Sequence, residues 1–147
     1  MRIRKVEAGG EVRRAAQRNN NPERIARRDS SALKAVINIG ERWSLTHAQL
    51  SNLLGAPERT VFTWKAAATG AGLGSPLARD TVERMSYVLG IWKALVILFP
   101  DDAVRQHWLT APNTAGTFGG QPPMTRLLAG NVGDLYAVRT YLDGARG

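Results

Sequence analysis

Residues 45–64 read LTHAQLSNLLGAPERTVFTW and have the layout of a helix-turn-helix. Thr46 is a good N-cap, and Gln49 stands three residues later in the capping-box position. Gly55 provides the left-handed residue that a tight turn between two helices needs. Pro57 is placed to open the second helix, because the first helical N–H needs no partner there. The sequence therefore predicts two short helices joined by a tight turn at Gly55.

The apolar residues of this segment fall on one side of each helix. We expect Leu50, Leu53 and Leu54 to face the core from the first helix, and Val61 and Trp64 from the second. The polar residues of the second helix then lie on its outer face, near enough to its start to reach bases or phosphates in a major groove. The predicted DNA contacts are Arg59, Thr60, Thr63 and Lys65. An unrelated helical hairpin and a protein-binding helix-turn-helix are the alternatives.

Helical patterns continue on both sides of this segment, and no strand is indicated. The predicted fold class is all-α, with a helix-turn-helix domain followed by a smaller helical domain. The helix from Pro76 to about Phe99 becomes apolar nearly all round, which favours central burial or a homodimer seam. The other predicted helices run from Ser30 or Ser31 to Ile39 and end near Gly40, from Asp101 or Asp102 to Trp108, from Pro123 to Leu128, and from Asn131 to Tyr141 or Leu142.

The chain is strongly basic, and its charge is uneven. The formal net charge is +8 and the sequence pI is about 10.8. Nine of the 20 Lys and Arg residues, but only four of the 12 acidic residues, lie in residues 1–30. We predict that residues 1–29 form a basic N-terminal arm. Such an arm either contacts a polyanion such as nucleic acid or is a disordered, solubilising tail.

The residue types that catalysis and metal binding require are scarce and scattered. The chain has no cysteine, which excludes disulfides and thiolate ligands and fits a reducing cytoplasm. Its two histidines, His47 and His107, lack neighbours at metal-ligand spacing. The glycine-rich residues 70–74 lack the preceding strand and the spacing of a dinucleotide-binding loop. We therefore expect no enzyme, no catalytic residue, no metal site and no cofactor.

The most apolar run of the chain, residues 87–99, is short and contains a charge. It cannot cross a bilayer at this length, and it includes Lys93. No apolar segment follows the basic start of the chain, so we expect no secretory signal. The prediction is a cytoplasmic protein without membrane contact.

Prolines and glycines give the C-terminal third a second ordered pattern. Trp108 lies in a predicted helix that Pro112 stops, and the glycine pair 119–120 permits tight backbone geometry before Pro123 opens the next helix. Such a loop-rich element costs conformational entropy to order. We interpret it as a surface that is held in a fixed shape.

Taken together, the helix-turn-helix and this element resemble the Xre/MbcA/ParS antitoxin family over roughly residues 31–143. The first part resembles the family's Xre-type helix-turn-helix, and residues 102–142 resemble its toxin-binding domain. The sequence departs from the family pattern at the looser stretch 114–117 and at an added Pro122. The matching positions in the second domain are Trp108, Pro112, Asn113, Gly119, Gly120, Pro123, Met124, Leu127, Ala129, Gly130 and Val132.

The resemblance implies a protein partner. Family members pair with a RES-domain toxin, which resembles an ADP-ribosyltransferase and attacks NAD, and they neutralise it by covering the entrance to its active site. They form homodimers, and many repress their own operon. After the basic arm at 1–29 that the charge distribution predicts, the resemblance implies a helix-turn-helix domain at 30–100 and a toxin-binding domain at 101–147. The expected toxin contacts are Pro112, Asn113, Gly119, Gly120, Pro123, Tyr136, Arg139, Tyr141 and Arg146.

Within this second domain, the aromatic residues allow two interpretations. Trp108 and Phe118 are either core residues behind the contact surface or anchors that enter the partner. We favour the core for Trp108, and we expect the outer face of the last helix and the tail 143–147 to make the contact. The alternative for the whole chain is a helix-turn-helix transcriptional regulator that binds operator DNA and has no toxin partner.

Overall fold

Every regular element in the described residues is an α-helix, which confirms the all-α prediction. The computed structural model describes residues 10–14 and 20–147, so residues 1–9 and 15–19 of the predicted basic arm lie outside the described part. The helices are α2 (Pro22–Arg42), α3 (His47–Leu54), α4 (Glu58–Thr69), α5 (Arg79–Leu98), α6 (Asp102–Thr110), α7 (Pro123–Leu127) and α8 (Val132–Arg146).

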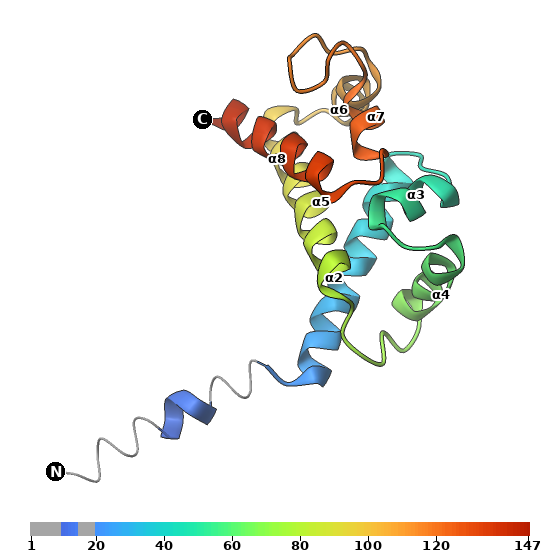
Figure 1. Ribbon diagram of the computed structural model, residues 1–147, viewed down its shortest axis with the longest axis vertical. Helices are drawn as coiled ribbons and strands as arrows, with labels where there is room; N and C mark the ends of the chain where they lie inside the picture. The colour runs from blue at the N-terminus through green and yellow to red at the C-terminus, as the bar shows by residue number, and fades with distance from the viewer. Residues whose placement is uncertain (1–9, 15–19) are drawn as a thin grey trace, which may run out of the picture.

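Helix α5 occupies the centre of the arrangement. It packs against α2 and α3 on one side and most extensively against α8 on the other. Figure 1 shows α3 and α4 together on one flank of α2, while α8, drawn in red, lies along the upper part of α5. Helices α6 and α7 close the end of the molecule above them. The N-terminal and C-terminal halves therefore meet along a single long helix.

Helix α2 begins earlier and ends later than the sequence predicted. Asn21 caps its start, where the side-chain oxygen accepts a hydrogen bond from the backbone N–H of Glu23 at 2.9 Å. The predicted caps, Ser30 and Ser31, lie inside the helix and donate their hydroxyl groups to carbonyls one turn back. The prediction was wrong because a serine hydroxyl can serve either a cap or a mid-helix carbonyl. Gly40, the predicted end, is also buried inside the helix.

Helix α5 begins at Arg79, and the prediction that Pro76 opens it was wrong. Residues 70–78 instead form a loop that two hydrogen bonds attach to α2. The Asp29 carboxylate accepts the N–H of Leu77 at 2.9 Å, and the Ser30 hydroxyl oxygen accepts the N–H of Leu73 at 2.8 Å. Pro76 lies in this loop because the chain must return from α4 to α2 before α5 can start.

A single hydrophobic core runs through both halves. The predicted inner face of α3 is confirmed, since Leu50, Leu53 and Leu54 are buried within it. In α4, Val61 is buried as predicted and Trp64 is half-buried against the core. Helix α2 contributes Leu33. Helix α5 adds Met85, Val88, Ile91 and Leu95, and the C-terminal half adds Leu109, Leu127, Leu135, Val138 and Leu142. Burial of each such side chain is worth roughly 1.5–3 kcal/mol. The C-terminal elements are therefore anchored to the same core as the helix-turn-helix.

Candidate functional site

The α3–α4 pair has the geometry of a helix-turn-helix. The Thr46 hydroxyl accepts the N–H of Gln49 at 3.1 Å, and the Gln49 side chain accepts the N–H of Thr46 at 2.8 Å, which completes the capping box. Gly55 has φ of 65°, the left-handed conformation that the turn requires. The predicted cap and turn are both confirmed, and they fix the direction in which α4 leaves the core.

The four predicted DNA contacts on α4 do not all lie on one face. Arg59 and Thr63 are exposed one turn apart, and the Thr63 hydroxyl donates to the carbonyl of Arg59 at 3.2 Å. Thr60 and Lys65 are half-buried. Lys65 lines a groove of about 350 Å³ between α4 and α2. The structure thus brings Arg59 and Thr63 together on the exposed stripe and places Lys65 at its edge.

Sequence reasoning missed a third member of this stripe. The Phe62 side chain is 70% exposed, three residues after Arg59 and beside Thr63. Its ring meets the His47 ring edge-on, with ring centroids 6.0 Å apart. His47 in turn donates from Nε2 to the Glu58 carbonyl at 2.8 Å. The helical period from Arg59 was the available signal, since it assigns position 62 to the outer face.

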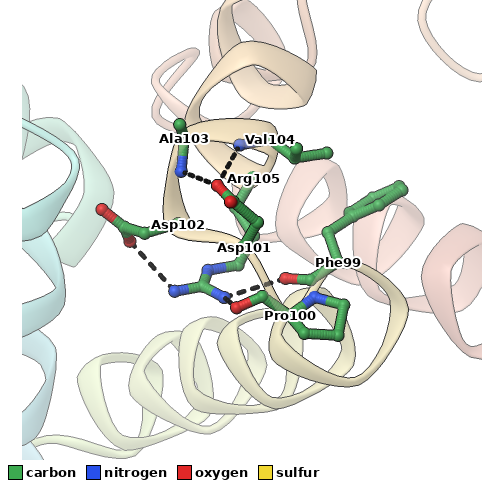
Figure 2. A network of polar contacts seen from close by, with 7 residues as sticks. All are labelled: Phe99, Pro100, Asp101, Asp102, Ala103, Val104 and Arg105. Carbon is green, nitrogen blue, oxygen red and sulfur yellow. Dashed lines mark hydrogen bonds and ion pairs between the residues drawn. The ribbon is translucent and has the colours of Figure 1, made fainter.

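A buried arginine fixes the corner between α5 and α6, as Figure 2 shows. One terminal nitrogen of Arg105 donates to the carbonyls of Phe99 and Pro100 at 2.8 and 2.9 Å, and the other to the Asp102 carboxylate at 3.0 Å. Asp101 caps α6 by accepting two backbone N–H groups, as the sequence predicted for position 101 or 102. These bonds satisfy the carbonyls at the end of α5 and set the direction of the C-terminal region.

The loop at 111–122 is held by its own backbone. The N–H of Gly120 donates to the carbonyl of Asn113 at 2.8 Å, and the N–H of Asn113 donates to the carbonyl of Gln121 at 3.2 Å. The Asn113 side chain also accepts the N–H of Ala115 at 3.0 Å. Gly119 and Gly120 both have positive φ, at 57° and 86°. Asn113 and the two glycines therefore give the loop its shape.

Four aromatic rings pack behind this loop. Trp108 lies at the centre, with ring centroids 5.6 Å from Phe118, 6.1 Å from Phe99 and 6.4 Å from Tyr141. Phe118 and Tyr141 also meet edge-on at 5.0 Å. Phe118 is buried, and Trp108 is half-buried against the main core. The cluster joins the loop, α6 and α8 into one body.

Arg126 ties the loop to α8 from the other side. Its Nε donates to the Asp134 carboxylate at 2.8 Å, and its Nη1 donates to the carbonyl of Thr117 at 2.5 Å. Asn131 donates from its side chain to the same carboxylate at 3.2 Å. Because a charge-assisted bond is stronger than a neutral one, Arg126 holds the loop at a defined distance from the first turn of α8.

The outer face of α8 carries an open groove of about 660 Å³. Tyr136, 57% exposed, lines it, and so does Tyr141, whose ring also packs against Trp108 and Phe118. The other lining residues are small or polar, namely Thr117, Ala137, Thr140, Gly144 and Ala145. Helix α8 continues to Arg146, so the prediction that it ends at Tyr141 or Leu142 was wrong.

Tyr136 also contacts α5 through a second tyrosine. The Tyr87 ring meets the Tyr136 ring edge-on, with centroids 5.8 Å apart. The Tyr87 hydroxyl donates to the Glu83 carboxylate at 3.0 Å. This hydrogen bond stabilises the protonated phenol and raises the pKa of Tyr87 above its ordinary value of 10.0.

The predicted partner contacts in this half thus fall into three groups. Tyr136 and Tyr141 line the groove. Arg139 and Arg146 lie on another side of α8, where both pair with Asp143 and Arg139 also donates to the carbonyl of Ser86 at 3.0 Å. The remaining predicted residues belong to the loop and α7, with Pro112, Gly119 and Gly120 exposed, Asn113 half-buried and Pro123 buried.

Across residues 10–14 and 20–147, no three His, Cys, Asp or Glu side chains lie together as metal ligands would. Within that same described part, none of the helices is both long and apolar enough to span a membrane.

Comparison with known proteins matches each half of the chain to a domain family. Residues 25–90 match the family described as the antitoxin Xre-like helix-turn-helix domain, and residues 94–147 match the antitoxin Xre/MbcA/ParS C-terminal toxin-binding domain. Both are binding domains rather than catalytic ones. The uncharacterized protein y4oB of Sinorhizobium fredii (strain NBRC 101917 / NGR234) is 40% identical over 131 residues, which cover 88% of this chain and 95% of that protein. The chain therefore belongs to the Xre/MbcA/ParS antitoxin family.

Proposed function

We propose that this chain neutralises a RES-domain, NAD-attacking toxin by binding over the entrance to its active site with the outer face of α8. The observation that carries the proposal is the open groove beside the exposed Tyr136 ring. Tyrosine combines a large apolar ring with a polar hydroxyl, and it is enriched among residues that dominate protein interfaces. The match of residues 94–147 to a toxin-binding domain supports a toxin as the partner of this half of the chain.

The surroundings of the groove also support binding. The aromatic cluster around Trp108 and the Arg126 contacts hold the groove from behind. A surface that is ordered before binding loses less conformational entropy on association. In this arrangement Asn113, Gly119, Gly120 and Pro123 support the contact by shaping the loop, and Tyr136 and Tyr141 meet the toxin.

Co-expression with the product of the neighbouring gene tests the proposal. The wild-type chain should co-purify with that product, relieve its toxicity and block its consumption of NAD. Tyr136→Ala should weaken all three, because it removes the exposed ring from the groove wall. Phe62→Ala is the matched control, since it removes another exposed ring from the opposite half of the chain. Failure of the wild-type chain to co-purify and protect would end the proposal.

We infer a second activity, repression of the chain's own operon, from the exposed stripe on α4. Arg59 and Thr63 offer hydrogen-bonding groups that can reach base edges in a major groove. Arg59→Ala should reduce discrimination among DNA sequences, and Lys65→Ala should weaken binding at the groove edge. The measurement is a gel-shift titration with the DNA upstream of the gene at two salt concentrations. DNA binding without any toxin binding would favour the alternative of a transcriptional regulator alone.

We also propose that the protein acts as a homodimer through the end of α5. Val96 and Ile97 are exposed there, and Val104 is exposed on the adjoining α6. Exposed apolar side chains that lie close together favour an interface. Two copies would present two α4 helices, as an operator with two half-sites requires.

A further inference from the structure

The exposed ring of Phe62 is held in a defined position on α4. The His47 ring packs against it edge-on at 6.0 Å. The Nε2 of His47 also donates to the Glu58 carbonyl at 2.8 Å, which joins the start of α3 to the start of α4. The Phe62 side chain nevertheless remains 70% exposed. It is therefore a supported ring that projects from the helix-turn-helix.

Phe62 also has chemically different neighbours on the same stripe. Arg59 precedes it by three residues and Thr63 follows it directly, and all three side chains are exposed. Three residues advance about 4.5 Å along a helix axis, close to the roughly 3.4 Å between base pairs along one DNA strand. Arg59 and Phe62 can therefore address neighbouring base pairs when α4 lies in a major groove.

We propose that Phe62 selects thymine in the recognised DNA by contact with its C5-methyl group, an inference that rests on the DNA-binding half of the proposed function. A phenyl ring has no hydrogen-bonding group, so the polar edges of guanine, cytosine and adenine offer it no direct partner. The thymine methyl group is the apolar feature of the major groove, and phenylalanine is among the side chains that contact it. Phe62 would then specify one base pair while Arg59 reads its neighbour.

The charge and shape of α4 favour DNA over a protein as the partner of this ring. Arg59 precedes the ring on the exposed stripe, and Phe62 itself lines the groove between α4 and α2. Two lysines, Lys34 and Lys65, and one acid, Glu41, line the same groove, so its lining carries a positive excess. The proposed toxin contact lies in the other half of the chain, on α8. A protein partner for Phe62 is the competing outcome that the experiment must detect.

The test uses the full chain and duplexes that the wild-type chain enriches from a library of random sequence. Each thymine of the enriched site is replaced in turn by deoxyuridine, which differs only in lacking the methyl group. Loss of one buried methyl costs roughly 0.8 kcal/mol, so one replacement should weaken wild-type binding about four-fold. The same replacement should leave the affinity of Phe62→Ala unchanged, whereas Phe62→Leu should retain part of the effect.

The controls separate the ways in which this inference can fail. Tyr136→Ala should respond to deoxyuridine as the wild-type chain does, and thermal unfolding should show that Phe62→Ala folds, because the ring is exposed. If no duplex is enriched, the DNA-binding half of the proposed function fails and takes the inference with it. If DNA is bound but every deoxyuridine replacement affects the wild type and Phe62→Ala equally, only the inference fails. Loss of toxin co-purification in Phe62→Ala, without a change in DNA binding, would also overturn it.

Discussion

The guanidinium group of Arg84 occupies the space that a side chain at position 55 would need. A Cβ atom built on Gly55 would lie 2.5 Å from both Cζ and Nε of Arg84. The buried Arg84 side chain also donates to the Asp80 carboxylate at 2.9 Å and to the carbonyl of Gly130 at 3.0 Å. One arginine of α5 therefore joins the turn of the helix-turn-helix to the connection between α7 and α8.

Gly55→Ala should destabilise the fold for two separable reasons. The positive φ of residue 55 costs a non-glycine residue roughly 1–2 kcal/mol, and the new methyl group must also displace Arg84. Urea denaturation should show a lower free energy of unfolding. Gly133→Ala is the control, because its Cβ would meet nothing within 4 Å on α8. Equal stabilities for the two variants would contradict this account of the turn.

Asp29→Ala should loosen the loop before α5. The buried carboxylate accepts the N–H of Leu77, and its loss leaves a half-buried donor unsatisfied, at a cost of about 1–3 kcal/mol. Asp29→Asn keeps an acceptor oxygen and should lose less. Thermal unfolding and hydrogen exchange at Leu77 measure the two effects. Slow exchange at Leu77 in Asp29→Ala would show that this bond does not hold the loop.

Arg126→Ala should weaken toxin binding without removing any side chain from the groove. The change breaks the contacts to Thr117 and Asp134 and so releases the loop from α8. We expect a less favourable entropy of binding in titration calorimetry, because the toxin must now order the loop. Arg126→Lys keeps a charge beside Asp134 and should recover part of the affinity. An unchanged affinity in Arg126→Ala would mean that the loop needs no such support.

The hydrogen bond of Tyr87 should contribute to the free energy of unfolding only at pH values at which the phenol is protonated. Its pKa is raised in the folded state by the hydrogen bond to Glu83, so the folded protein holds this proton more tightly than the unfolded chain does. The contribution is complete below the ordinary value of 10.0 and is lost as the pH rises through the folded-state pKa. Ultraviolet absorbance titration should show a phenolate component above that value which Tyr87→Phe removes. Glu83→Gln should move this component to lower pH.

Ile97→Asp should shift the protein from dimer to monomer if the end of α5 forms the seam. The side chain is 51% exposed, so a charge can be accommodated in the monomer but not in an apolar interface. Sedimentation equilibrium at micromolar concentration measures the shift. Val12→Asp, at another exposed apolar residue, should leave the association state unchanged. If the wild-type chain sediments as a monomer, the proposed dimer interface at the end of α5 is wrong.

Local signals were sufficient for much of the fold. The capping box of Thr46 and Gln49, the left-handed Gly55 and the buried Leu50 all depend on residues close together in sequence, and the structure confirms each of them. The start of α2 was not predictable in this way, because Ser30 has the chemistry of a cap but donates to a carbonyl within the helix. Position along the chain does not distinguish these two uses of a hydroxyl group.

The polar contacts that position the candidate site depend on the tertiary fold. Arg84 reaches Gly130 across 46 positions of sequence, and Arg139 reaches Ser86 across 53. The hydrophobic periodicity of a single helix cannot predict such pairs, because they form only after α8 packs on α5. Phe62 was missed for a different reason, since an apolar residue next to Val61 suggests burial until the face of each position is considered.

The central position of α5 limits how this protein can be recombined. The two family matches meet between residues 90 and 94, within a helix that runs from Arg79 to Leu98 and packs on both halves. A chimera joined at that boundary would combine half-helices whose buried faces were selected against different neighbours. Exchange of toxin specificity between relatives should therefore succeed when α5 and α8 are transferred together as one inherited unit.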